Sequence, residues 1–222
     1  MSFITASITG PCAGCDTDTA ISSGSEARCL FDATPYLFIF RYVSLTQGEA
    51  SGDLSQTELV NLTGAGWYVG MIQHAHLSGT TLTASMGTSD GIAAVVNCDA
   101  IGLSNIAPVV WVDIESFGAG SDPIGYAENW AQQVIDGGFR PGLYYGAANP
   151  GTYGLTLAQV NELLSSPYFY AAWSGCGAPQ GPQKITQGPC VVTMSCPSYS
   201  VAIDEDAIPS GDVLNDAFVV AG

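Results

Sequence analysis

The segment at 107–118, A-P-V-V-W-V-D-I-E-S-F-G, constrains the fold of this chain more than any other. Alternate side chains of a strand point to opposite faces, so the branched residues of V-V-W-V-D-I-E share one face. Trp111, Asp113 and Glu115 share the other face, which ends in two carboxylates before a glycine-rich loop. This pattern suits a parallel barrel, in which outward residues pack under helices and inward residues at the strand's C-terminal end line a pocket.

Strand-like and helix-like segments alternate along the chain, which favours a parallel α/β fold. A first short strand is expected to end near Asp16, and further strands are expected at 37–44, 66–76, 107–115, 140–146, 168–173 and 201–206. Helices are expected at 19–32, 54–62, 89–100, 122–136, 156–165 and 213–219. Between 176 and 199, Gly, Pro and Cys interrupt two short strand-like pieces, which predicts irregular later strands. We predict a single (β/α)8 TIM-like barrel domain over residues 1–222, a fold that about 200 to 250 residues can build.

Charge is sparse and one-sided, with four Lys and Arg against twenty Asp and Glu and a formal net charge of −16. So few cations argue against a nucleic-acid partner or an anionic membrane surface. No run approaches the roughly 20 apolar residues that a membrane-spanning helix needs. The N-terminus has no basic region and no long apolar core, so no signal peptide is expected in this chain. The polar, weakly charged composition nevertheless predicts an extracellular or cell-surface protein.

Seven cysteines are many for a reducing cytosol, and the odd count leaves at least one unpaired or intermolecular. We expect disulfides among the late cysteines Cys176, Cys190 and Cys196. A four-thiolate zinc site built from these and the Cys12-x-x-Cys15 pair is a weaker interpretation, because the late cysteines have poor spacing for zinc.

Three acidic sites fall on predicted strands: Asp16 on the first, Asp113 and Glu115 on the central one, and Asp204 with Asp206 on the last. The first and last strands of a barrel are neighbours, so all three sites are expected at one mouth. Clustered carboxylates cannot all ionise cheaply, so the most enclosed one becomes a proton donor while its neighbours stay charged. Such a set can cleave a glycosidic bond. We predict Glu115 as the general acid and Asp16, Asp113 and Asp204 as supporting carboxylates.

Five short motifs in this order resemble those of the glycoside-hydrolase-like barrels called domain of unknown function 1906. They are G-C-D-T-D-T at 14–19, F-I-F-R-Y at 38–42, V-D-I-E-S at 112–116, G-L-Y-Y-G at 142–146 and V-A-I-D-E-D at 201–206. These barrels are relatives of the family 25 lysozymes, which cut the muramic acid–glucosamine linkage of bacterial cell walls. The resemblance implies Glu115 as proton donor, Asp113 as the carboxylate that positions or stabilises the sugar, and Asp16 and Asp204 as flanking acids.

Two motifs depart from the lysozyme pattern. The usual Tyr-His-aromatic run on the third strand is I-Q-H-A-H at 72–76, and the Trp-Gln-Tyr-like run before the last strand is reduced to I-T-Q at 185–187. Substrate contacts at these two strands are therefore expected to differ from those of the lysozymes.

Polar and aromatic side chains near strand ends are candidates for binding a sugar substrate. Arg41 lies in an apolar strand, and because a buried guanidinium needs a carboxylate partner, we expect it to pair with the inward acidic cluster. The remaining candidates are Gln73, His74, His76, Trp111, Tyr145 and Trp173. His74-x-His76 also resembles a metal-binding pair, but two histidines and one lysine in the whole chain are too few for a two-metal hydrolase. No metal or other cofactor is predicted.

The predicted function is a glycoside hydrolase that cleaves cell-wall peptidoglycan or a related amino-sugar polysaccharide by carboxylate acid/base catalysis. The main alternative is a catalytically inactive barrel that acts as a carbohydrate-binding or self-assembling extracellular structural protein, since fold alone does not separate the two. A third alternative is metal-dependent hydrolysis of a phosphoester or amide, which requires a metal held by His74, His76 and Asp113. The oligomeric state is left open.

Overall fold

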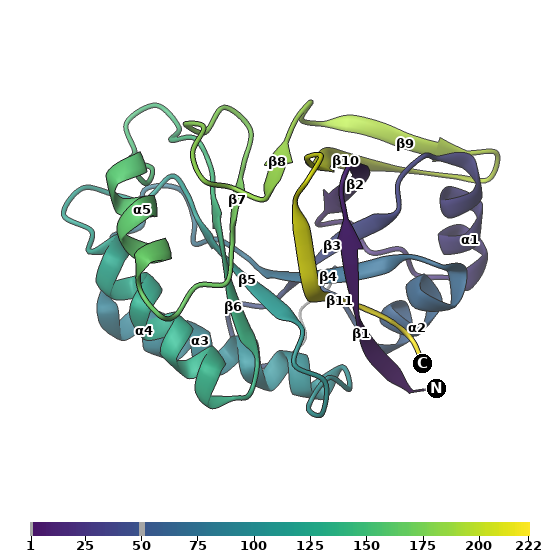
Figure 1. Cartoon of the computed structure of the whole chain (residues 1–222), viewed down its shortest axis with the longest axis horizontal. Coiled ribbons are helices and arrows are strands. Elements are labelled where there is room, and N and C mark those ends of the chain that lie inside the picture. Colours follow the sequence, from purple (N-terminus) through teal and green to yellow (C-terminus); the bar gives the residue numbers. More distant parts are fainter. Residues whose placement is uncertain (1, 49–51) are drawn as a thin grey trace.

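The chain closes into an eight-stranded barrel, as the alternation of strands and helices predicts (Figure 1). The computed structural model describes residues 2–48 and 52–222. Seven barrel strands run parallel, and a pairing between β4 and β5 closes the ring. They are β2 (Cys12–Thr17), β3 (Phe38–Val43), β4 (Tyr68–Gln73), β5 (Val109–Ile114), β6 (Arg140–Tyr145), β7 (Ala172–Ser174) and β8 (Ile185–Gln187). The eighth strand, β10 (Tyr199–Ile208), lies between β2 and β8 and is antiparallel to both.

Five helices within the described residues follow β2 to β6 and cover the outside of the barrel (Figure 1). They are α1 (Gly24–Ala33), α2 (Gln56–Ala65), α3 (Ala84–Ala100), α4 (Pro123–Asp136) and α5 (Leu157–Ser165). Their starts are set by side chains that accept a hydrogen bond from the first helical turn, as Asp122 and Thr156 do for α4 and α5. Thr83 starts α3 five residues earlier than the sequence pattern predicts, and Ser23 starts α1 later. In the described part of the chain, no helix has the length and hydropathy needed to cross a bilayer.

Two apolar layers result from the two faces of each strand. Val110, Val112 and Ile114 belong to the outer layer between strands and helices, as the alternation on β5 predicts. The barrel interior is filled by aromatic rings, with Phe40 stacked on Trp173 at 4.4 Å between centroids. A Cβ on the neighbouring strand position 70 would overlap the Phe40 ring, so glycine is needed there to admit it. This aromatic interior forms the floor on which the acidic side chains lie.

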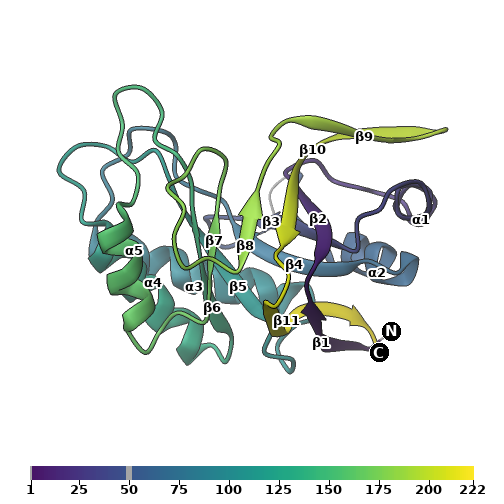
Figure 2. The same cartoon turned by 45° about the horizontal axis from the view of Figure 1, so that its top comes forward.

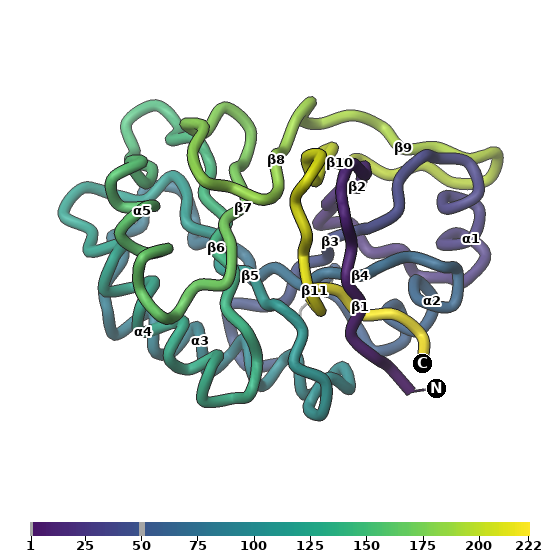
Figure 3. The backbone as a smooth tube through the Cα atoms, viewed as in Figure 1, coloured from purple at the N-terminus to yellow at the C-terminus, as the bar shows by residue number. Residues whose placement is uncertain are grey.

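The C-terminal segment is a strand, so the prediction of a helix at 213–219 is wrong. Strand β11 (Val213–Ala221) pairs antiparallel with β1 (Phe3–Thr9), and it also pairs with β4 at Val219 (Figures 1 and 3). Leu214 and Phe218 enter the interior apolar layer. The helix prediction fails because the partner of this β-branched segment lies at the other end of the chain, where local pattern does not reach. The two termini consequently lie side by side (Figure 3).

The last barrel strand reverses the expected direction. A hairpin of β9 (Val192–Cys196) and β10 extends away from the barrel, and the distal half of β10 pairs with β9 (Figure 2). The proximal half of β10 then enters the ring beside β2, so Asp204 lies mid-strand and not at a C-terminal strand end. Strand β7 is also shorter than predicted, beginning at Ala172 instead of 168.

Two disulfides fix the late segments. Cys176 pairs with Cys190, in agreement with the expectation for the late cysteines, whereas Cys196 pairs with Cys29 of α1. The second bond ties β9 to a helix 167 residues away in sequence, a separation at which spacing gives no information. Cys12, Cys15 and Cys98 are free thiols.

Candidate active site

A cavity of about 430 Å³ opens at the C-terminal ends of the parallel strands. All four carboxylates predicted to act in catalysis line it, together with Tyr42 and His74 at the ends of β3 and β4. These carboxylates come from β2, from β5 and the position directly after it, and from β10, and Asp204 lies directly opposite Asp16 in the β2–β10 register. The fold therefore brings together acids that are up to 188 positions apart in the sequence (Asp16 to Asp204).

The two acids of β5 differ in their surroundings. Asp113 is only 7% exposed, and its Oδ1 has no hydrogen-bond partner within the described residues. Burial, with the nearby Glu115 and Asp16 charges, raises the pKa of Asp113 well above its usual range. Glu115 is half-buried, and burial followed by the charge of Asp204 raises its pKa. A Cβ at position 146 would overlap the Glu115 carboxylate, so Gly146 at the end of β6 leaves the space that this group occupies.

Asp16 lines the cavity, and Asp206 is a second buried carboxyl close enough to influence it. Asp16 accepts hydrogen bonds from Gln187 Nε2 at 2.6 Å and from the Tyr42 hydroxyl at 3.3 Å, yet burial raises its pKa to about 7. Asp206 is 3% exposed and accepts a hydrogen bond from Trp173 Nε1 at 3.0 Å. Burial raises the pKa of Asp206 well above its usual range, and the charge of Asp16 raises it further.

Sequence reasoning placed Asp206 in the acidic group but selected only Asp204 as a site residue. Asp204, Asp206 and Ile208 alternate on β10, and Ile208 belongs to the barrel interior. That two-residue period was the available signal that Asp206 also points inward.

Gln187 on β8 orients Asp16. Its Oε1 accepts hydrogen bonds from the Tyr144 hydroxyl at 3.0 Å and from the Cys176 backbone N–H at 2.9 Å. With the amide oxygen used in this way, the amide nitrogen is turned toward Asp16. Tyr144 is thus the inward tyrosine of the G-L-Y-Y-G motif. Tyr145, predicted to bind substrate, points outward, where it is fully buried and its hydroxyl donates to Pro179 and Gln183.

The two histidines have separate environments. His74 lines the cavity, stacks on Tyr42 at 4.6 Å between ring centroids, and its Nε2 lies 2.8 Å from Asp53 Oδ1. His76 lies outside the residues that line the cavity, and its Nε2 is 2.6 Å from Asp90 Oδ2. Each histidine is therefore held by its own aspartate, and only His74 is placed to contact a ligand in the cavity.

Arg41 and Gln73 lie on the outward faces of their strands, so neither reaches the acidic cluster. Arg41 donates to Glu58 Oε1 of α2 at 2.7 Å and to the backbone carbonyl of Thr17. The expected pairing of Arg41 with the inward acids is wrong, because Arg41 alternates with the inward residues of β3. Gln73 donates to the backbone oxygens of Ser44 and Asp90 and accepts a hydrogen bond from the Trp130 indole. The polar groups of both side chains therefore form hydrogen bonds in the layer between the strands and the helices.

Trp111 and Trp173, also predicted to bind substrate, are fully buried in the aromatic floor. Their rings pack edge to face at 5.9 Å between centroids. Neither ring has a free face for a sugar, and Trp173 acts on the site through its hydrogen bond to Asp206.

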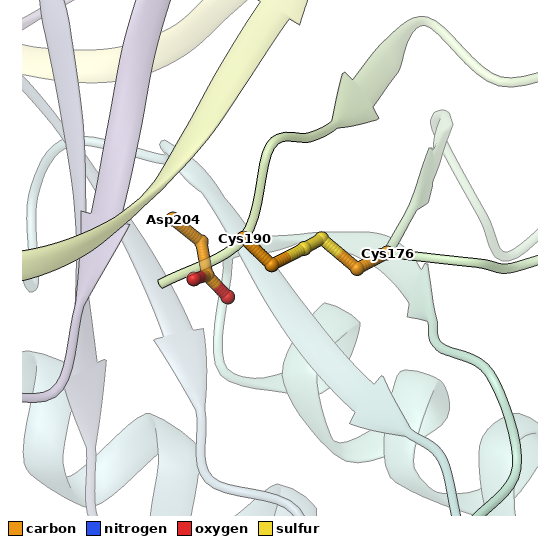
Figure 4. Close-up of side chains that lie close together, drawn as sticks. All are labelled: Cys176, Cys190 and Asp204. Carbon is orange, nitrogen blue, oxygen red and sulfur yellow. A yellow bond between two sulfur atoms is a disulfide. The ribbon is translucent and has the colours of Figure 1, made fainter. Parts of the chain in front are cut away.

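Asp204 lies beside the Cys176–Cys190 disulfide (Figure 4). A metal site needs several ligand atoms close together. Among the described residues, these three are the one group of three or more His, Cys, Asp or Glu residues whose potential ligand atoms all lie within 4.8 Å of one another. Sulfur atoms joined in a disulfide are not thiolates, so the group as it stands does not have the donor set of a zinc site. The bond instead joins the loops that follow β7 and β8 at the edge of the cavity.

The barrel and its family are recognised by comparison with known proteins. The chain is similar in structure to the Tat-secreted protein Rv2525c of Mycobacterium tuberculosis, with a TM-score of 0.63 and 16% identity over 91% of this chain and 97% of that one. It is also similar to the catalytic domain of the endolysin ply40 from a bacteriophage of Listeria monocytogenes, with a TM-score of 0.60 and 14% identity over 90% of this chain and 94% of the other.

At these identities the structural similarity establishes the fold alone. A search of curated protein sequences finds no match. The sequence profile of the Rv2525c-like, glycoside hydrolase-like domain matches residues 29–187, which is most of the chain. The chain therefore belongs to the Rv2525c-like, glycoside hydrolase-like domain family.

Proposed function

We propose that this protein is a glycoside hydrolase that cleaves an amino-sugar polysaccharide such as peptidoglycan, with Glu115 as the general acid. The observation that carries the proposal is the half-buried Glu115 carboxyl, with its raised pKa, in a cavity that also holds Asp16, Asp113 and Asp204. A general acid must be protonated at working pH, and burial beside other acids provides that condition. The family and the similarity to an endolysin catalytic domain support the same class of reaction.

In the proposed reaction, Glu115 gives its proton to the glycosidic oxygen as the bond from that oxygen to the anomeric carbon breaks. Asp113, which lines the cavity two positions from Glu115, positions the sugar, and the ionised carboxylates among the lining acids stabilise the positive charge that develops on it. A water molecule then adds to the anomeric carbon, and its proton returns to a carboxylate of the cavity. Gln187 and Tyr42 keep Asp16 in place through their hydrogen bonds.

Isosteric replacement of the proposed acid tests this function. Glu115→Gln keeps the shape of the side chain but cannot give up a proton, so release of reducing sugar from peptidoglycan or chitin is expected to fall by about 10² to 10⁴-fold. Glu162→Gln, on the exposed side of α5, is the matched control and should retain full activity. Equal activity of the two variants would refute the role of Glu115.

A barrel that only binds carbohydrate is the other outcome of this experiment. In that case the unmodified protein would bind the polymer without releasing reducing sugar, and Glu115→Gln would leave binding unchanged. The two disulfides support a place outside the reducing cytosol, where such a polymer is found.

A further inference from the structure

None of the few cationic side chains of this protein lines the cavity. Arg41 is buried against Glu58, and Arg28 lies on α1, 3.6 Å from Asp32. Arg140 begins β6 and Lys184 immediately precedes β8, so both lie at the end of the barrel opposite the cavity. These four are all the lysines and arginines of the chain. Nothing with a fixed positive charge therefore balances the cavity acids at close range.

The cavity itself is strongly acidic. Asp16, Asp18, Asp113, Glu115 and Asp204 all line it. Asp113 is only 7% exposed, and within the described residues no partner donates to its buried Oδ1. The one lining residue within the described chain that can become cationic is His74, and its Nε2 already lies against Asp53. A concave surface with charges of one sign concentrates the field and attracts ligands of the opposite sign.

We propose that the polysaccharide bound here carries free, protonated amino groups, so that its ammonium groups supply the positive charge that the cavity lacks. The proposed ligand is a polymer of unacetylated hexosamine units, and its class deepens the function proposed above, on which it rests. An ammonium group offers three donors, which suits the several carboxylates that line the cavity. The same carboxylates repel polymers that carry uronic acid or phosphate groups. N-acetylated units have no ammonium group, so such polymers gain no charge attraction from these carboxylates.

Binding of such a ligand should release protons. Burial and mutual repulsion favour the protonated forms of the cavity acids, and a bound cation favours the ionised forms. Proton release on binding therefore depends on the charge of the ligand. An uncharged sugar of the same length should release no protons when it binds.

The test measures binding separately from turnover. Glu115→Gln protein is titrated calorimetrically with a glucosamine hexamer, with an N-acetylglucosamine hexamer and with a uronic acid oligomer, at mildly acidic pH where the amines are protonated. We expect the glucosamine hexamer to bind at least about tenfold more tightly than the acetylated one, as one partly shielded charge pair can provide. Its affinity should fall with added salt, and its binding heat should depend on the buffer because protons are released.

Two single-charge variants in the Glu115→Gln background localise the effect. Asp18→Asn removes an exposed acid that lines the cavity, and should weaken binding of the glucosamine hexamer by about two- to fivefold. Asp136→Asn removes an exposed acid at the far end of α4 and should leave binding unchanged. Equal affinity for the acetylated and unacetylated hexamers, or affinity that does not respond to salt, would overturn the proposal.

Failure of this inference and failure of the proposed function give different results. If the unmodified protein cleaves acetylated chitin or peptidoglycan and shows no preference for free amines, the hydrolase stands and the ligand class is wrong. If the amine polymer binds selectively but the unmodified protein cleaves none of the polymers, the ligand class stands and the hydrolase is wrong.

Discussion

At the scale of single residues, the site depends on which carboxyl holds a proton. Glu115 is set apart from its neighbours by partial exposure, which leaves it accessible to a substrate, and by a pKa raised through burial and through Asp204. Asp16 and Asp206 are more fully buried than Glu115, and burial raises the pKa of each. A cavity in which each acid has a different environment can assign donor and stabiliser to different groups, as glycosidases require.

The pH profile of hydrolysis should report the influence of Asp204 on Glu115. If Glu115 is the general acid, kcat falls as pH rises through its pKa, which defines the alkaline limb. Removing a neighbouring negative charge makes ionisation easier, so Asp204→Asn should lower this pKa and move the alkaline limb to lower pH. The measurement is kcat against pH for the unmodified protein, for Asp204→Asn and for the remote Asp136→Asn. The alkaline limb of Asp136→Asn should coincide with that of the unmodified protein. An alkaline limb that stays in place or moves to higher pH contradicts the assignment.

At the scale of elements, a buried ion pair fixes α2 against β3 and against the loop that follows β2. Arg41 donates to Glu58 and to the carbonyl of Thr17, the residue after Asp16, while Glu58 also accepts from the Ile21 backbone N–H at 2.8 Å. Ser55 caps α2, and the Glu58 side chain bonds Arg41 and Ile21 instead of reaching back to the cap. The pair therefore holds the loop next to the active site.

Breaking this pair on one side should be costly. Glu58→Met leaves a buried guanidinium without its carboxylate, so we expect the free energy of unfolding to drop by about 3–5 kcal/mol. Replacing both partners, as in Arg41→Met with Glu58→Met, removes the uncompensated charge and should recover much of that loss. Urea denaturation of the two variants measures the difference. A double variant less stable than the single one would show that the pair itself stabilises the fold.

At the scale of the whole molecule, the buried acids couple stability to pH. Burial raises the pKa values of Asp16, Asp113 and Asp206 in the folded state, so the folded protein binds more protons than the unfolded chain. The stability that these three aspartates contribute is fully present below the ordinary aspartate pKa of about 4. It is lost as pH rises through their pKa values in the folded protein, which is about 7 for Asp16. The net charge of −16 adds self-repulsion in the same direction.

We therefore expect the melting temperature to fall between about pH 5 and about pH 8. Asp206→Asn, which mimics the protonated carboxyl, should reduce this slope, raising the melting temperature mainly at the higher pH. Differential scanning calorimetry across this range, with the exposed Asp136→Asn as control, makes the comparison. A melting temperature that rises with pH would mean that these carboxyls are ionised in the folded protein.

Much of the architecture could be predicted from local pattern. The two-residue period of β5 correctly divides the outward Val110 from the inward Asp113, because a strand's geometry fixes the directions of its own side chains. Helix starts at Asp122 and Thr156 follow from hydrogen bonds that span only three residues. The barrel and the meeting of Asp16 with Asp113 and Glu115 follow from the parallel order of these units.

Other features depend on partners far along the chain. The same alternation that places Asp113 inward also places Arg41 and Tyr145 outward and Tyr144 inward, once the register of each strand is known. The pKa of Asp206 is raised by burial and then by the charge of Asp16, and both depend on β10 entering the barrel beside β2.

The sequence by itself determined the barrel, the inward direction of the β5 acids and the family to which the chain belongs. Tertiary structure alone decided the reversed direction of β10, the strand conformation of β11, the pairing of Cys29 with Cys196 and the partner of Arg41. The physical reason is the separation along the chain over which each effect acts. Dihedral preference, side-chain alternation and capping act over a few residues. Strand pairing, ion pairing and burial are set by segments that meet only when the chain has folded.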